Sequence, residues 1–146
     1  MSAATTPRKG SPAASEAWSL IHQLFMMQRS RFLAIASELE LAPAQLGALK
    51  SLEPGTPVPM SRLADTLACD NSNVTGIVDR LEARGLVERR ADEHDRRVKM
   101  LVVTERGAEL RRRFVERMSE PPPQLAALPP AEQRALRDIM RRVLGQ

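Results

Sequence analysis

Short polar side chains on one face of a predicted helix are the groups in this sequence best suited to contact a nucleic acid. The helix is expected over residues 72–84, with Val74, Ile77, Val78 and Leu81 on its apolar face. The opposite face carries the candidate contacts Ser72, Asn73, Thr75, Gly76 and Arg80. Hydroxyl, amide and guanidinium groups near a helix N-terminus can hydrogen-bond phosphate oxygens and base edges. We therefore expect this face in the major groove of double-stranded DNA. Helix capping is a competing role for Ser72, and both roles can hold together.

Arginines in a predicted hairpin supply a second set of candidate DNA contacts. Residues 86–90 and 98–104 alternate enough to pair as strands, and a charged turn joins them. Acidic residues balance the charge of this turn, so we expect Arg96 and Arg97 to be aimed individually at the minor groove or its flanking phosphates. Asp95 precedes Arg97 by two residues and is expected to hold that guanidinium in one pose. Arg89, on the first strand, is a further candidate contact.

A helix that leads directly into a basic hairpin has the geometry of a winged helix. A second helix over residues 60–68 and a cap-rich turn before residue 72 complete a helix-turn-helix. We predict a mainly α fold with a small β-wing, in which residues 15–146 form a single domain. Its winged helix-turn-helix lobe covers residues 43–104, and the flanking residues 15–40 and 105–146 form dimerisation helices. Residues 1–14 are small and polar and are expected to be a disordered tail.

The first predicted helix is apolar on more than one side. Such a helix needs two surfaces to pack against, which favours a homodimer, although a long helix that crosses its own domain remains an alternative. A pocket for a small apolar or anionic effector is a hypothesis for this helix, and its candidate lining residues are Leu24, Phe25, Gln28, Arg31 and Phe32. A methionine- and phenylalanine-rich core without any pocket explains the same residues equally well.

Composition narrows the class of protein. The chain has 146 residues, a net charge of +4 and a pI of about 10.2, which mildly favours an anionic partner. All but three of its 22 basic residues are arginine, a bias that suits phosphate and guanine but that a G- and C-rich genome would also produce. A single cysteine, Cys69, excludes an intrachain disulfide and fits a cytoplasmic protein. Cys69 also lies at a predicted helix N-terminus, where a thiolate-based oxidation sensor is a remote alternative.

Several classes find no support in the sequence. There is no signal-like or membrane-spanning run, so no membrane partner is expected. His22 and His94 stand alone and far apart, so no metal site is expected, and no cofactor-binding loop or nucleophile motif is present. We therefore expect a protein that is not an enzyme. A winged helix that binds only proteins, or an architectural DNA binder without a ligand, remains an alternative.

Four short motifs in one order resemble the MarR family of bacterial winged-helix regulators. They are Val74-Thr75, the run from Val78 to Val87, Asp95-Arg96-Arg97, and Thr104-Glu105-Arg106-Gly107. The resemblance implies a homodimer whose interface is built by the first, fifth and sixth helices. This dimer is expected to bind a roughly palindromic operator. The resemblance also implies a ligand pocket between the dimerisation helices and the DNA-reading lobe. We therefore expect a sequence-specific transcriptional regulator that acts as a ligand-responsive repressor.

Three positions depart from the family pattern. Gly76 stands where many members carry arginine, which removes one candidate DNA contact. Ala42 replaces the common capping threonine or serine, a change that costs about 1 kcal/mol of local stability. The proline run at 121–123 is expected to alter how the fifth and sixth helices meet.

Overall fold

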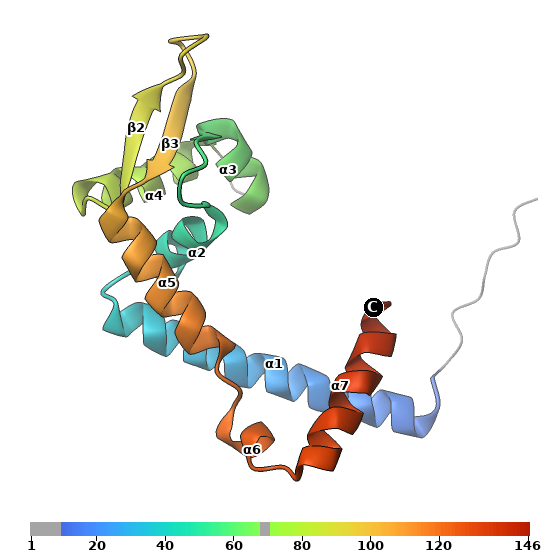
Figure 1. Cartoon of the computed structure of the whole chain (residues 1–146). Coiled ribbons are helices and arrows are strands. Elements are labelled where there is room, and N and C mark those ends of the chain that lie inside the picture. The colour runs from blue at the N-terminus through green and yellow to red at the C-terminus, as the bar shows by residue number, and fades with distance from the viewer. Residues whose placement is uncertain (1–9, 68–70) are drawn as a thin grey trace, which may run out of the picture.

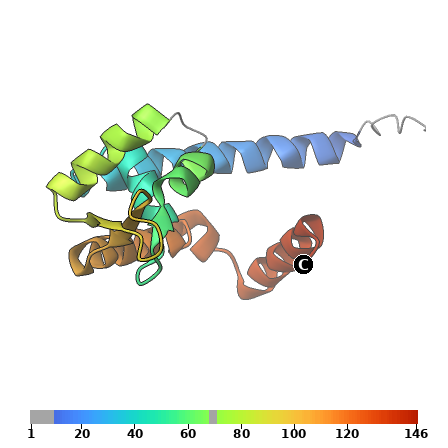
Figure 2. The ribbon, with the colours of Figure 1, turned by 90° about the horizontal axis from the view of Figure 1, so that it is seen from above.

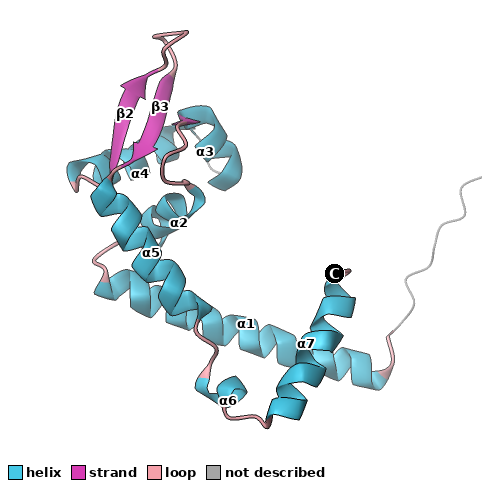
Figure 3. Ribbon diagram, viewed as in Figure 1, coloured by secondary structure: helices cyan, strands magenta, loops and turns pink. Residues whose placement is uncertain are grey.

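The computed structural model describes residues 10–67 and 71–146, except for the side chains of residues 71 and 72. A compact lobe with a protruding hairpin lies at one end of a long helix, α1 (Pro12–Glu38), and the C-terminal helix lies toward the other end (Figure 1). The long helix α5 (Glu105–Ser119) descends from the base of the hairpin to α1 and joins these two parts. Figure 3 shows that the fold is mainly helical with one small sheet, as the sequence predicts.

Helix α1 begins three residues earlier than predicted. The side chain of Ser11 accepts a hydrogen bond from the backbone N–H of Ala14 at 3.2 Å, and Pro12 occupies the first turn. A serine cap followed by proline is a strong start signal that the low complexity of the tail obscured. The predicted tail over residues 1–14 is therefore too long by residues 12–14, and residues 1–9 lie outside the described chain.

The lobe packs three short helices around an aliphatic core. They are α2 (Pro43–Ser51), α3 (Met60–Leu67) and α4 (Asn71–Ala83). Leu46, Leu49, Leu63, Val78 and Leu81 are at most 1% exposed, so the apolar faces read from the sequence all point inward. α3 and α4 follow one another along the chain as the two helices of the predicted helix-turn-helix, and residues 68–70 between them lie outside the described chain.

A three-stranded antiparallel sheet forms the wing. Strands β2 (Val87–Ala91) and β3 (Lys99–Val103) pair with Arg89 opposite Leu101, and each begins one residue later than predicted. A third strand, β1 (Val58–Pro59), pairs with the other edge of β3 and was not predicted. Two residues that include a proline carry no alternating pattern, so sequence periodicity cannot detect such a strand.

Gly85, Thr104 and Gly107 join α4, the sheet and α5. Gly85 ends α4 with φ of 68°, a left-handed conformation that glycine adopts without steric cost. The Thr104 hydroxyl donates to the Gly85 carbonyl at 2.6 Å and accepts from the Gly107 N–H at 3.0 Å, which caps α5. A Cβ on Gly107 would lie 2.0 Å from the Leu86 carbonyl oxygen, so only glycine fits there. These contacts give the Thr-x-x-Gly motif a structural role.

The C-terminal region stands away from the lobe. After the proline run come a single-turn helix, α6 (Pro123–Ala126), and the longer helix α7 (Pro130–Leu144). α7 crosses α1 in Figure 1, but Figure 2 shows that it is set apart from α1 in depth. No residue of α7 is buried within the described chain.

Helix length and composition bear on a membrane role. Among the described residues, no single helix is both long and apolar enough to cross a membrane. α1 and α2 pass that test only when they are taken together, and the chain bends by 95° between them.

Candidate nucleic-acid interface

The outward face of α4 is available for contact with another molecule. Val74, Ile77 and Val78 are at most 7% exposed and anchor the helix, whereas Asn73 and Arg80 are exposed on the other side. Thr75, Gly76 and Asp79 are exposed as well. The structure thus brings the predicted major-groove residues onto one surface, except for Ser72, whose side chain lies outside the described residues.

The hairpin rises beside α4 at the same end of the lobe (Figure 1). Its tip is shaped by two aspartates. The Asp92 carboxylate accepts hydrogen bonds from the backbone N–H groups of His94 at 3.1 Å and Asp95 at 3.0 Å. The N–H of Asp95 and then that of His94 lower the pKa of the Asp92 carboxyl, because they stabilise its charged form. Sequence reasoning missed Asp92, although an acidic residue at the start of a turn is a recognisable signal.

Asp95 holds the backbone of Arg97 more closely than its guanidinium. Its carboxylate accepts from the Arg97 N–H at 3.0 Å, whereas the ion pair to the Arg97 Nε is 3.9 Å long. The Arg97 side chain is 95% exposed, and Arg96 is also exposed. Asp95 therefore fixes the direction in which Arg97 leaves the hairpin and leaves its guanidinium able to bind an anion.

Arg89 is engaged inside the molecule and does not project toward a ligand. Its guanidinium pairs with the carboxylates of Asp79 and Glu82, each at 2.5 Å, and its side chain is only 22% exposed. Burial lowers the pKa of Arg89, but hydrogen bonds to these two carboxylates outweigh it, so the pKa is raised. The expectation that Arg89 contacts DNA does not fit this geometry, because Arg89 ties the wing to α4. Glu82 also accepts from the Arg89 backbone N–H at 3.2 Å, which strengthens that link.

Arg84 is a second link that the sequence did not reveal. Its guanidinium donates to the Glu40 carbonyl and, at 3.3 Å, to the Leu39 carbonyl, both just beyond the end of α1. Carbonyl groups at a helix C-terminus carry partial negative charge and favour a cation. Since Arg84 directly follows α4, this contact couples the orientation of α4 to that of α1.

Crossed arginine contacts hold α1 against α5. Arg117 pairs with the Glu38 carboxylate, and this pairing lowers the pKa of Glu38. Arg31 donates to the Arg117 carbonyl, to the Glu120 carbonyl at 2.8 Å and to the Glu120 carboxylate at 3.2 Å. These contacts join α1 to the end of α5, between the lobe and the C-terminal region.

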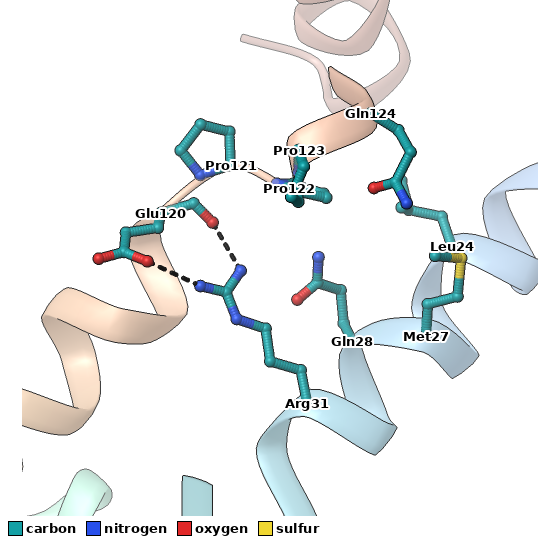
Figure 4. Close-up of a pocket in the computed structure, with 9 residues that line it drawn as sticks. All are labelled: Leu24, Met27, Gln28, Arg31, Glu120, Pro121, Pro122, Pro123 and Gln124. Carbon is teal, nitrogen blue, oxygen red and sulfur yellow. Dashed lines mark hydrogen bonds and ion pairs between the residues drawn. The ribbon is translucent and has the colours of Figure 1, made fainter. Parts of the chain in front are cut away.

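A cavity of about 430 Å³ opens beside Arg31, between α1 and the segment that follows α5 (Figure 4). Leu24, Gln28 and Arg31 line it, as the effector hypothesis expected, together with Met27, Glu120, the prolines at 121–123 and Gln124. Phe25 and Phe32 do not line it. Phe32 packs edge to face on Phe114 with ring centroids 5.5 Å apart, and Phe25 is 64% exposed. Only three of the five candidate residues line the cavity because consecutive residues of an α-helix point about 100° apart.

Apolar side chains on α1 and α7 lack a covering layer in the single chain. Trp18, Phe25, Met27, Val143 and Leu144 are 53–69% exposed. A groove of about 420 Å³ between the two helices is lined mainly by apolar residues, including Ile21, Leu24, Leu136 and Met140. Contiguous apolar surface of this kind marks an interaction site.

The described residues form no candidate metal site. Within residues 10–67 and 71–146, no three His, Cys, Asp or Glu side chains gather closely enough to hold an ion. Cys69 lies outside the described residues, so the structure adds nothing on a redox role for it.

A helix-turn-helix whose second helix leads into an antiparallel hairpin defines a winged helix protein. Residues 41–99 match the model of the MarR family. The transcriptional repressor MprA of Escherichia coli is 37% identical over 87 residues, which cover 59% of this chain and 49% of MprA. Over residues 41–99 the chain is thus similar to proteins of the MarR family, and it spans about half the length of this curated relative.

Solved structures agree over nearly the whole chain. A transcriptional regulator from Thermotoga maritima is 25% identical, with a TM-score of 0.75 over 90% of this chain and 93% of that one. A mutant of MepR from S. aureus, solved bound to an oligodeoxyribonucleotide, is 17% identical, with a TM-score of 0.69 over 88% and 96%. The fold beyond residues 41–99, including the flanking helices, is therefore shared with these proteins.

Proposed function

We propose that this protein is a sequence-specific DNA-binding regulator of transcription, a repressor that acts as a homodimer in the cytoplasm and not an enzyme. One observation carries the proposal: the hydrogen-bonding face of α4 and the exposed arginines of the wing lie at the same end of the lobe. Asn73, Thr75, Gly76 and Arg80, with Ser72 before them, face the major groove, and Arg96 and Arg97 reach the minor groove or its phosphates. MprA, the curated relative, is named a transcriptional repressor, which supports the same role here.

The proposal is tested by retardation of duplex DNA of random sequence. The full chain should retard it at low salt and release it as salt rises, because phosphate contacts release counterions. No retardation at low salt would contradict DNA binding and favour a protein-binding winged helix. If selection from the same random pool then enriches no sequence, an architectural DNA binder is favoured.

The dimer is proposed from the uncovered apolar faces of α1 and α7. A second copy of the chain would bury them and hold two wings and two copies of α4 on one face of the duplex. Sedimentation equilibrium should give twice the chain mass. Val143→Asp should give a monomer, because it buries an unpaired charge in the interface. Ala131→Asp adds the same charge to α7 away from the apolar face and should leave the dimer intact.

An effector site is proposed at the cavity beside Arg31. Leu24 and Met27 offer apolar contact, and Arg31 offers a cation that an anionic ligand would share with or take from Glu120. Such a ligand would alter the contacts between α1 and the end of α5, and so the separation of the two lobes. In a screen of small aromatic carboxylates, a compound that binds this site should raise the melting temperature of the wild-type protein. Arg31→Gln should abolish that rise, and an unchanged rise would place the ligand elsewhere.

A further inference from the structure

Gly76 lies in the middle of α4, where glycine is a poor helix former. Its φ is not among the positive values that the described glycines Gly55, Gly85 and Gly145 adopt. Apart from its chain neighbours and the adjacent backbone of α4 itself, a Cβ built on Gly76 meets no heavy atom of the described chain within 4 Å. Neither backbone conformation nor internal packing therefore requires glycine at this position.

Gly107 shows what an internal requirement looks like. There a Cβ would lie 2.0 Å from the Leu86 carbonyl oxygen and 3.0 Å from the Val103 side chain. Gly76 has no such neighbour, so any close approach that would exclude a side chain must come from another molecule.

The neighbours of Gly76 indicate which molecule that is. Asn73 and Arg80 are exposed and lie three residues before and four residues after it, so the three positions share one face of α4. Gly76 leaves a gap between an amide and a guanidinium, two groups that read adenine and guanine edges. The backbone amides in the middle of a helix are already hydrogen-bonded within it, so the gap offers only van der Waals contact.

We infer that Gly76 is a specificity-determining residue whose gap receives the C5-methyl group of a thymine, between the base pairs that Asn73 and Arg80 contact. This inference rests on the proposed function. The thymine methyl is the apolar group that base pairs present in the major groove, and it is the size of the side chain that glycine lacks. The gap at Gly76 thus selects for thymine, in addition to removing the DNA contact that an arginine would make at this position.

The test combines a protein change with a DNA change. An operator is first selected with the wild-type chain, and each thymine of its half-sites is then replaced by uracil, which lacks the methyl group. For the wild-type protein, one such replacement in each of the two half-sites should lower affinity about 15-fold, because each of the two buried methyl groups is worth about fourfold. Gly76→Ala should bind the thymine operator about tenfold or more weakly because two methyl groups then compete for one space. On the uracil operator that loss should shrink to about threefold or less.

Gly47→Ala is the matched control. Gly47 lies in α2, and a Cβ there also meets no heavy atom of the described chain within 4 Å apart from its chain neighbours and the adjacent backbone of α2. Both alanine variants should raise the melting temperature by about 3 °C, because alanine favours the helix. Only Gly76→Ala should lose DNA affinity, so a fall in affinity with a rise in stability separates recognition from folding.

Three results would overturn the inference while leaving DNA binding in place. In the first, no uracil replacement weakens the wild-type protein. In the second, Gly76→Ala binds as tightly as the wild type. In the third, Gly76→Ala loses affinity by the same factor on the thymine and uracil operators, which would show that the gap faces the sugar–phosphate backbone and not a base. Failure of the wild-type chain to bind any duplex would overturn the proposed function and this inference with it.

Discussion

Replacing Arg97 with alanine should weaken operator binding and flatten its dependence on salt. The Arg97 side chain is 95% exposed at the hairpin tip, and its nearest ion pair, to Asp95, is 3.9 Å long. Such a pair contributes little in the free protein, so its loss should leave the folded state nearly unchanged. The effect of the substitution should therefore be confined to the complex with DNA.

The magnitude follows from counterion release. Each phosphate contact adds about 0.9 to the slope of log affinity against log salt, so two wings in a dimer contribute about 1.8. Between about 50 and 200 mM salt, a fourfold change, that slope corresponds to a factor of about 12 in affinity. Arg97→Ala should therefore lose about 12 times more affinity at the low end of this range than at the high end.

The assay is fluorescence anisotropy with a labelled operator over that salt range. Arg134→Ala removes the same charge from exposed α7, far from the wing, and should keep the wild-type slope. An Arg97→Ala slope equal to that of the wild type would show that the wing does not touch phosphate. A reduced affinity with an unchanged slope would point to a lost base contact instead.

Three further substitutions or titrations test the fold and the wing. Gly107→Ala should lower the free energy of unfolding by about 3 kcal/mol in urea titration, since its Cβ would overlap the Leu86 carbonyl, and a loss of under about 1 kcal/mol would contradict that contact. Ala42→Ser should raise the free energy of unfolding by about 1 kcal/mol, because the side chain of Ala42 cannot cap α2. The hydrogen bond at this helix start runs the other way, from the Ala42 N–H to the Gln45 side chain at 3.2 Å. The Asp92 carboxyl should titrate below its ordinary pKa in NMR. Because its folded pKa is lowered, the order it gives the hairpin tip should persist above the unfolded pKa and be lost as pH falls through the folded one; a titration at or above the ordinary value would refute the hydrogen bonds assigned to it.

Local signals made much of the fold predictable. The spacing of Val74, Ile77, Val78 and Leu81 identified the buried face of α4, and all four residues are at most 7% exposed. Gly85 marked the end of that helix because a left-handed residue is required there. Features of this kind depend on a few neighbouring residues, so the sequence displays them directly.

Contacts between distant segments were not predictable in the same way. Arg89 resembles the other hairpin arginines in sequence, but the register of β2 places its guanidinium beside Asp79 and Glu82 on α4. Arg84 bonds carbonyl groups some 45 residues earlier in the chain. The choice of partner for a long charged side chain depends on tertiary geometry, which periodicity and spacing do not encode.

The candidate effector residues divide for the same reason. Leu24, Gln28 and Arg31 line the cavity because the segment after α5 turns across α1 at the proline run. Phe32 sits only one residue beyond Arg31 but faces Phe114 on α5. The candidate stretch of α1 borders the cavity, and the packing of α5 decides which of its faces does so.

Selection of bound sequences from a random duplex pool tests most directly whether two copies of α4 read DNA as a pair. The full chain should enrich a palindrome whose half-sites are centred about 10 base pairs apart, because a dimer places its two reading helices in successive major grooves. Enrichment of a single half-site without symmetry, or of no sequence at all, would contradict the proposed dimeric reading of DNA.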